Sequence, residues 1–135
     1  MEKVYGVSDL LQKEHEAIER ELIELEDIVH DVTPNFPNLK HTFLKLTQIW
    51  DVHEAKEEKF FIFLQKQGFT IPIKTLLFEH GKLKRIKDTI LNIILSGKQD
   101  EIKKVLEKEG RDLIKNIKEH MRKEEWIFYA LPDKF

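Results

Sequence analysis

Hydrophobic residues recur at alternating steps of three and four along four segments of this 135-residue chain. This is the spacing of the inward stripe of an amphipathic helix. Helix-breaking residues separate the segments, namely Pro34 and Pro37, then Gly68 and Pro72, then Ser96 and Gly97. Because the connections are short, we expect an all-α fold, an up-down-up-down antiparallel four-helix bundle that occupies residues 1–135 as a single domain.

Polar residues interrupt the hydrophobic stripes at six positions: His15, His53, Glu57, His80, His120 and Glu124. A helix rises about 1.5 Å per residue, and this rise places all six in one layer of the bundle. Burying an unpaired carboxylate costs several kcal/mol. The two glutamates therefore predict a bound cation, or else a complete hydrogen-bond network in a polar core. The third stripe is less regular and continues through either Ile86 or Lys87.

The chain also repeats itself. His53 to Leu64 (HEAKEEKFFIFL) and His120 to Leu131 (HMRKEEWIFYAL) share a His, a Glu pair that begins four residues later, and matching Phe and Leu positions. Residues 14–20 and 79–85 share a Glu-His pair, an aliphatic residue and an Arg. Each half of a duplicated helical hairpin would then supply two histidines and one paired carboxylate, which is the ligand set of a two-metal centre.

Other features of the sequence narrow the classes of function. The chain has no cysteine, which excludes disulfides, thiolate zinc sites and iron-sulfur clusters. Lys and Arg alternate with Glu along every segment, so we expect no nucleic-acid partner. The N-terminal sequence lacks signal-peptide organisation and no apolar run is long enough to span a bilayer, so we expect a cytoplasmic protein without a membrane partner. We expect the protein to be a monomer or a homodimer.

Three further acid and histidine positions carry no predicted role. Glu19 lies four residues after His15, but it falls off the hydrophobic stripe and should be solvated. His30 and His41 lie outside the polar layer. For the layer itself, imidazoles with two carboxylates that can bridge suit a pair of iron or manganese ions. Iron is our first choice and manganese the second.

From about Asp9 to Leu131 the chain resembles the hemerythrin-like, or HHE cation-binding, family of four-helix bundles. The resemblance implies two non-haem iron ions (Fe2+/Fe3+), with a bridging oxo or hydroxo group, whose ligand is O2 or another small diatomic or peroxide. Carried over residue by residue, His15 and His53 would bind one iron and His80 and His120 the other. Glu57 and Glu124 would bridge both.

One position departs from the family pattern. Oxygen-carrying hemerythrins have a further His four residues after the first ligand of the third helix, and this chain has Lys84 there. Water, or Glu54 as a seventh ligand, would complete the iron site. The resemblance thus implies binding or sensing of O2, with oxygen or iron sensing, storage or delivery as the role. The alternatives are a di-iron redox enzyme that handles peroxide or nitric oxide or repairs iron centres, and a structural bundle with a hydrogen-bonded core.

Overall fold

The computed structural model describes residues 6–31 and 34–132. Their helices are α1 (Val7–His30), α2 (Phe36–Lys66), α3 (Ile73–Ser96), and a fourth helix composed of α4 (Gln99–Val105), the π-helical turn η2 (Leu106–Gly110) and α5 (Arg111–Tyr129). No strand occurs in these two ranges. The predicted all-α four-helix bundle is confirmed.

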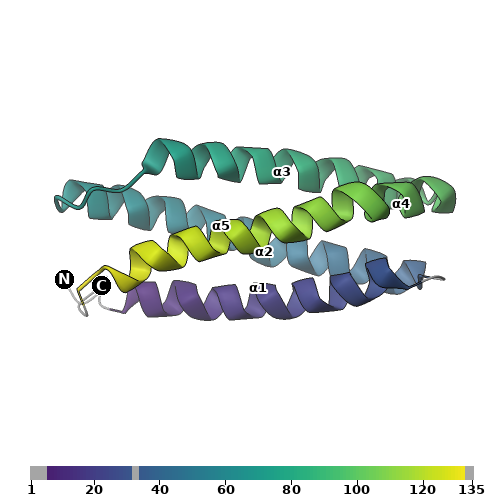
Figure 1. The fold of residues 1–135 in the computed structure, drawn as a ribbon, viewed down its shortest axis with the longest axis horizontal. Coiled ribbons are helices and arrows are strands. Elements are labelled where there is room, and N and C mark those ends of the chain that lie inside the picture. Colours follow the sequence, from purple (N-terminus) through teal and green to yellow (C-terminus); the bar gives the residue numbers. More distant parts are fainter. Residues whose placement is uncertain (1–5, 32–33, 133–135) are drawn as a thin grey trace.

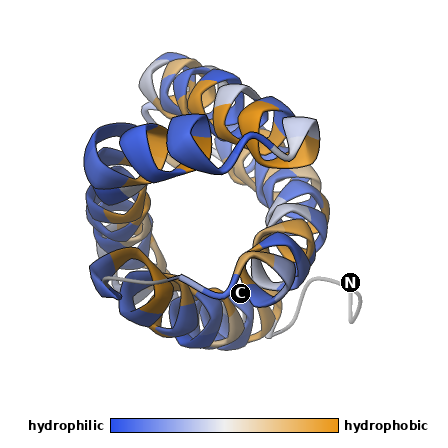
Figure 2. Ribbon diagram, turned by 90° about the vertical axis from the view of Figure 1, so that its right-hand side faces the viewer, coloured by the Kyte–Doolittle hydropathy of each residue, from blue (hydrophilic) through white to orange (hydrophobic). Residues whose placement is uncertain are grey.

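The helices surround a common axis. α1 packs against α2 and α5, and α3 packs against the same two helices from the other side (Figure 1). α1 begins and α5 ends at the same end of the bundle. Viewed along the bundle, each helix alternates hydrophobic and hydrophilic residues around its circumference (Figure 2). None of the described helices is both long and apolar enough to cross a lipid bilayer.

Local signals explain where the helices begin and end. The Asn35 side chain caps α2 by accepting a hydrogen bond of 3.0 Å from the backbone N–H of Asn38. Pro37 lies in the first turn of α2, where its missing N–H needs no helical partner. α3 ends at Ser96 and is capped by Gly97, whose φ of 73° is a left-handed conformation that glycine adopts without strain.

The hydrophobic core divides into two clusters along the bundle. The smaller cluster lies near the start of α1 and includes Leu11, Phe60 and Phe128, whereas the larger one extends from Ile18 and Trp50 toward the other end. On each helix the predicted polar residues fall between members of the two clusters. The polar layer is therefore enclosed by apolar side chains above and below.

Two details of the stripes differ from a regular pattern. In α3 the buried residue is Lys87 rather than Ile86, and its ammonium pairs with Asp51 of α2. In the fourth helix the π-helical turn ends at the buried Gly110, where an added Cβ would lie 3.3 Å from Leu106 Cδ2. That distance is tight, so glycine suits this position.

Candidate metal centre

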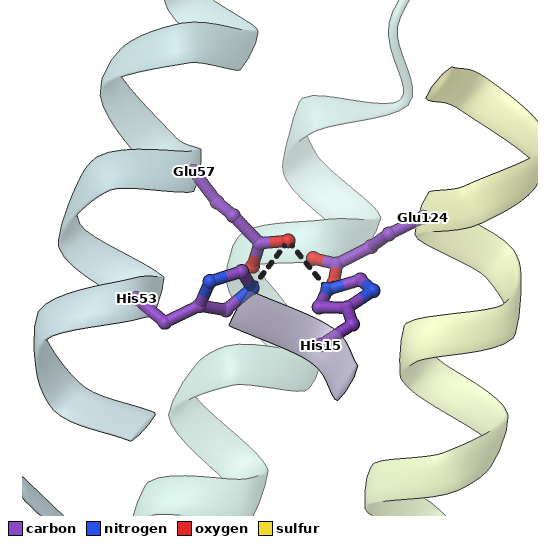
Figure 3. A group of neighbouring side chains, drawn as sticks. All are labelled: His15, His53, Glu57 and Glu124. Atoms are coloured by element: carbon purple, nitrogen blue, oxygen red, sulfur yellow. Dashed lines mark hydrogen bonds and ion pairs between the residues drawn. The ribbon is translucent and has the colours of Figure 1, made fainter. Parts of the chain in front are cut away.

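The six polar residues of the stripes meet at the middle of the bundle. Each is at most 2% exposed. They form two overlapping groups, in which potential ligand atoms lie within 4.8 Å of one another: His15 and His53 with Glu57 and Glu124, and His80 and His120 with the same two glutamates. Figure 3 shows the first group. Both carboxylates thus belong to both groups.

Two of the histidines reach both carboxylates. Nε2 of His15 lies 3.1 Å from Glu57 Oε2 and 3.2 Å from Glu124 Oε1. Nε2 of His80 lies 3.1 Å from Glu124 Oε2 and 3.6 Å from Glu57 Oε1. These two rings come from α1 and α3, whereas Glu57 belongs to α2 and Glu124 to α5. The two carboxylates therefore connect all four helices.

The other two histidines each face the glutamate four residues later on the same helix. His53 Nε2 lies 2.9 Å from Glu57 Oε2, and His120 Nε2 lies 2.9 Å from Glu124 Oε2. Residues four apart share one helix face, which is why the His-x3-Glu spacing brings these atoms together. All four Nε2 atoms therefore point toward one pair of carboxylates.

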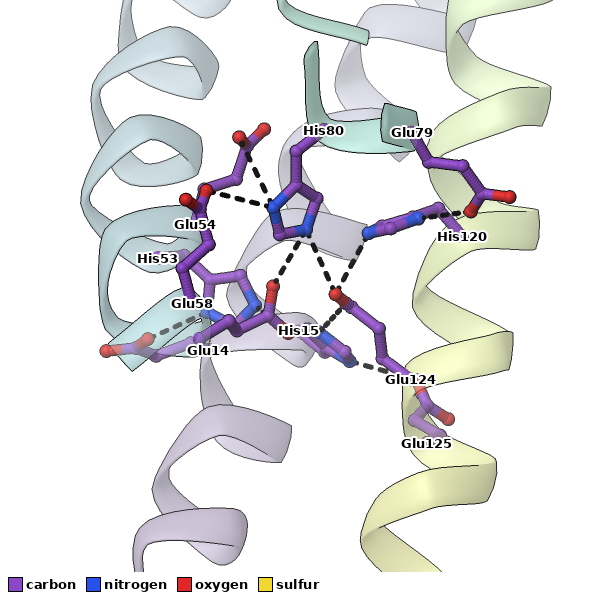
Figure 4. A network of polar contacts seen from close by, with 11 residues as sticks. Glu14, His15, His53, Glu54, Glu58, Glu79, His80, His120, Glu124 and Glu125 are labelled. Atoms are coloured by element: carbon purple, nitrogen blue, oxygen red, sulfur yellow. Dashed lines mark hydrogen bonds and ion pairs between the residues drawn. The ribbon is translucent and has the colours of Figure 1, made fainter. Parts of the chain in front are cut away.

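The second ring nitrogen of every histidine also has a carboxylate partner. The Nδ1 distances are 2.8 Å from His53 to Glu14, 2.7 Å from His120 to Glu79, 3.2 Å from His15 to Glu125, and 3.1 Å from His80 to Glu58 (Figure 4). An Nδ1–H that donates to a carboxylate fixes the orientation of the ring and leaves Nε2 available as a metal ligand.

These four outer carboxylates occupy matching positions in the two halves of the internal repeat. Glu14 and Glu79 each precede a histidine of the centre and bind the histidine of the next helix, and each is held in turn by a lysine. Lys56 Nζ lies 2.6 Å from Glu14 Oε2, and Lys123 Nζ lies 2.7 Å from Glu79 Oε2. The contacts therefore follow a pseudo-two-fold exchange of α1 with α3 and of α2 with α5.

The centre balances its buried charge with protons when no metal is bound. Burial alone would lower the pKa of both His15 and His80, but ion pairs with Glu57 and Glu124 outweigh it and raise these values to about 10 and about 11. Burial would raise the pKa of Glu57, yet its histidine partners hold it well below the usual range. In the metal-free protein, imidazolium ions therefore compensate the buried carboxylates.

This arrangement predicts how the stability of the metal-free protein depends on pH. The pKa of His15 is raised from 6.5 to about 10, so its contribution is fully present below pH 6.5 and is lost as the pH rises through 10. His80 acts in the same direction up to about pH 11. We expect the melting temperature, measured by circular dichroism with a chelator present, to fall by several degrees between pH 6.5 and pH 10. A flat profile would contradict the imidazolium assignment.

The residues fit a pair of metal ions. His53 Nε2, His120 Nε2, Glu57 Oε1 and Glu124 Oε1 are buried, and none has a hydrogen-bond partner in the described ranges. The short contacts of these two Nε2 atoms with Glu57 and Glu124 lack hydrogen-bond geometry. Such atoms are normally satisfied. A mixed imidazole and carboxylate set that could satisfy them through bound cations suits iron or manganese.

Glu54, the seventh predicted ligand, lies outside both groups. Its Oε2 is 3.8 Å from Nδ1 of His80, on the side of that ring away from the shared carboxylates. Burial raises the pKa of Glu54 to about 7, against the opposing effect of His80 and Lys87. Lys84 is exposed beside the same ring. The structure thus brings six of the seven predicted residues together, and a role for Glu54 as an inner ligand stays a prediction.

Sequence reasoning missed the four outer carboxylates. Their signal was present in the repeats, as the Glu that precedes His15 and His80 and as the second member of each Glu pair, Glu58 and Glu125. In the sequence alone, these positions indicate only the duplication. Their function depends on reach between neighbouring helices, which the periodicity of one helix does not specify.

Fold and site together define a helical-bundle protein with a buried histidine and carboxylate centre able to bind metal cations. The family described as hemerythrin HHE cation binding domain matches residues 6–131. The chain therefore belongs to this family, and the resemblance found from the motifs is confirmed. Neither the curated proteins nor the solved structures returned a match.

Proposed function

We propose that this chain is a non-haem di-iron protein that binds or senses O2. The observation that carries the proposal is the pair of four-residue groups that share Glu57 and Glu124. In each group two histidines would hold one iron, and the shared carboxylates would bridge the two ions. Bound iron would supply reversible electron transfer to or from a small ligand.

The walls of the centre support a small, weakly polar ligand. The Trp50 ring centroid lies between 6.2 and 6.5 Å from the rings of three of the four histidines. The Phe128 centroid lies 5.9 Å from that of His15. These aromatic side chains are buried and keep bulk water from the shared carboxylates. O2 is apolar and therefore matches such surroundings in polarity.

A second function has its own supporting observation. A solvent-open cavity of about 470 Å3 adjoins His80, at the helix face where oxygen-carrying hemerythrins have a further His and this chain has Lys84. A solvent-filled approach to His80, and an iron position with one histidine ligand fewer, would favour reactions with polar molecules. The second candidate is therefore a redox enzyme that handles peroxide or nitric oxide, or that repairs iron centres.

Optical spectroscopy distinguishes these functions. The protein is loaded with Fe2+ without air, exposed to O2, and then purged with argon while the visible spectrum is recorded. O2 binding or sensing predicts a charge-transfer band that appears with O2 and bleaches on purging. A band that persists until a reductant is added would favour the redox enzyme.

The control is the Glu57→Ala/Glu124→Ala double variant, treated identically. It lacks both shared carboxylates, so it should show no band above that of free iron under the same conditions. A wild-type spectrum that does not change when O2 is admitted would contradict both functions.

A further inference from the structure

A groove between α2 and α3 leads from the surface to the outer side of His80. Three carboxylates line it, from Asp51, Glu54 and Glu58, together with the exposed ammonium of Lys84. Its volume is about 470 Å3, which is ample for a hydrated metal ion. Asp51 pairs with the Lys87 ammonium, so Glu54 and Glu58 supply the uncompensated acidic charge of the groove, which ends at a histidine of the centre.

The inner end of the groove gathers a third set of potential ligands. Ligand atoms of Glu54, Glu58 and His80 lie within 4.8 Å of one another. Glu58 Oε2 is 3.1 Å from His80 Nδ1, and Glu54 Oε2 is 3.8 Å from the same atom. Figure 4 shows both side chains directed at this nitrogen, while the other ring nitrogen faces the shared carboxylates.

Glu54 is the residue that distinguishes this cluster from an ordinary acidic surface. The residue is only 8% exposed, although it lines the groove. Its Oε1 is buried and has no hydrogen-bond partner among the described residues. Burying an unpaired carboxylate oxygen is unfavourable, and a cation in the groove would compensate it.

We infer that Glu54, Glu58 and Nδ1 of His80 form an entry site that holds a divalent metal ion before it moves to the buried centre. The inference rests on the proposed metal centre, and adds to it the route of loading and the residues that serve it. The site would take Fe2+ and related ions that accept nitrogen and oxygen ligands.

The chemistry of His80 explains why this site would be used in transit. In the metal-free protein both ring nitrogens of His80 carry a proton, so an ion that binds Nδ1 displaces that proton to solvent while Nε2 keeps its own. When the ion moves inward, Nε2 becomes the ligand and the proton returns to Nδ1, where Glu58 accepts its hydrogen bond. The outer and inner positions thus use the same ring alternately.

The pseudo-two-fold counterpart lacks these features. Glu125 contacts Nδ1 of His15 as Glu58 contacts that of His80, but the position that matches Glu54 is Met121. The positions that match Asp51 and Ala55 of the groove are Lys118 and Arg122, two basic residues. Cations should therefore be attracted more strongly to the α2–α3 groove than to its counterpart.

The kinetics of metal loading test this inference. Metal-free protein is mixed with Co2+ at low ionic strength, and the visible absorption of the bound ion is followed with time, with final stoichiometry from metal analysis. Glu54→Gln should load about tenfold or more slowly, because the carboxylate no longer attracts the entering ion. The final number of bound ions should equal that of the wild type.

The matched control is Glu119→Gln, which removes the same charge from an exposed residue beside His120, in a different groove. It should load at the wild-type rate. Glu54→Met, which copies Met121, should load as slowly as Glu54→Gln and provides a second variant if that one misfolds. Equal rates with full loading would overturn the entry site alone. Wild-type protein that binds no Co2+ would overturn the metal centre as well.

Discussion

Replacing both shared glutamates should empty both metal positions. In the Glu57→Ala/Glu124→Ala variant each group keeps only its two histidines. A transition-metal ion that stays bound to a protein usually has three or four protein ligands. After loading with Fe2+ and desalting, we expect metal analysis to find about two ions per wild-type chain, as the two groups imply, and almost none per variant chain.

The charge-matched control is Glu19→Ala/Glu119→Ala, which changes two exposed acids outside both groups. It should bind metal as the wild type does. Glu57→Gln/Glu124→Gln should behave like the Ala variant while preserving side-chain volume. If the Ala and Gln variants both retain wild-type iron, the two glutamates do not bridge.

Removing the metal should lower the melting temperature substantially. Ligands that bind only the native state stabilise it, by about 2.7 kcal/mol when the free concentration is a hundred times Kd. For a chain of this length, that free energy corresponds to a decrease on the order of 10 °C on chelation. Thermal unfolding followed by circular dichroism, before and after treatment with a chelator, measures the difference.

Metal analysis of the same samples must show that the ions have gone. The Glu57→Ala/Glu124→Ala variant is the control, because chelator should leave its melting temperature unchanged. If the wild type also shows no change after demonstrated removal, then the hydrogen bonds and ion pairs of the polar layer stabilise the bundle without metal.

The fold could be predicted because each helix buries one stripe. The stripe of α1, from Leu11 through His15 to Val29, is buried as its spacing indicated. The positions of His15 and Glu57 in one layer followed from the rise per residue, because connections are short. Continued past Glu124, the alternation of three and four leads to Ile127, but in the last turn of α5 the buried residue is Phe128 and Ile127 is half-buried.

The outer parts of the site could not be derived from periodicity. Spacing does not decide whether Ile86 or Lys87 is buried in α3. The long aliphatic stem of a lysine can lie in a core while its ammonium pairs elsewhere, here with Asp51. The Nδ1 contacts of Glu14 and Glu125 cross between helices, so they depend on how the helices are rotated about their axes. Spacing along one helix contains no information about that rotation.

The Nδ1 contacts have a consequence for how metal uptake relates to folding. Carboxylates hold all four imidazoles in place without any ion, so the conformational entropy of these side chains is lost when the chain folds. Small domains built around a structural ion fold only when it binds. In this bundle, by contrast, we expect uptake to exchange protons for cations within a chain that is already folded, so that occupancy follows the free metal concentration.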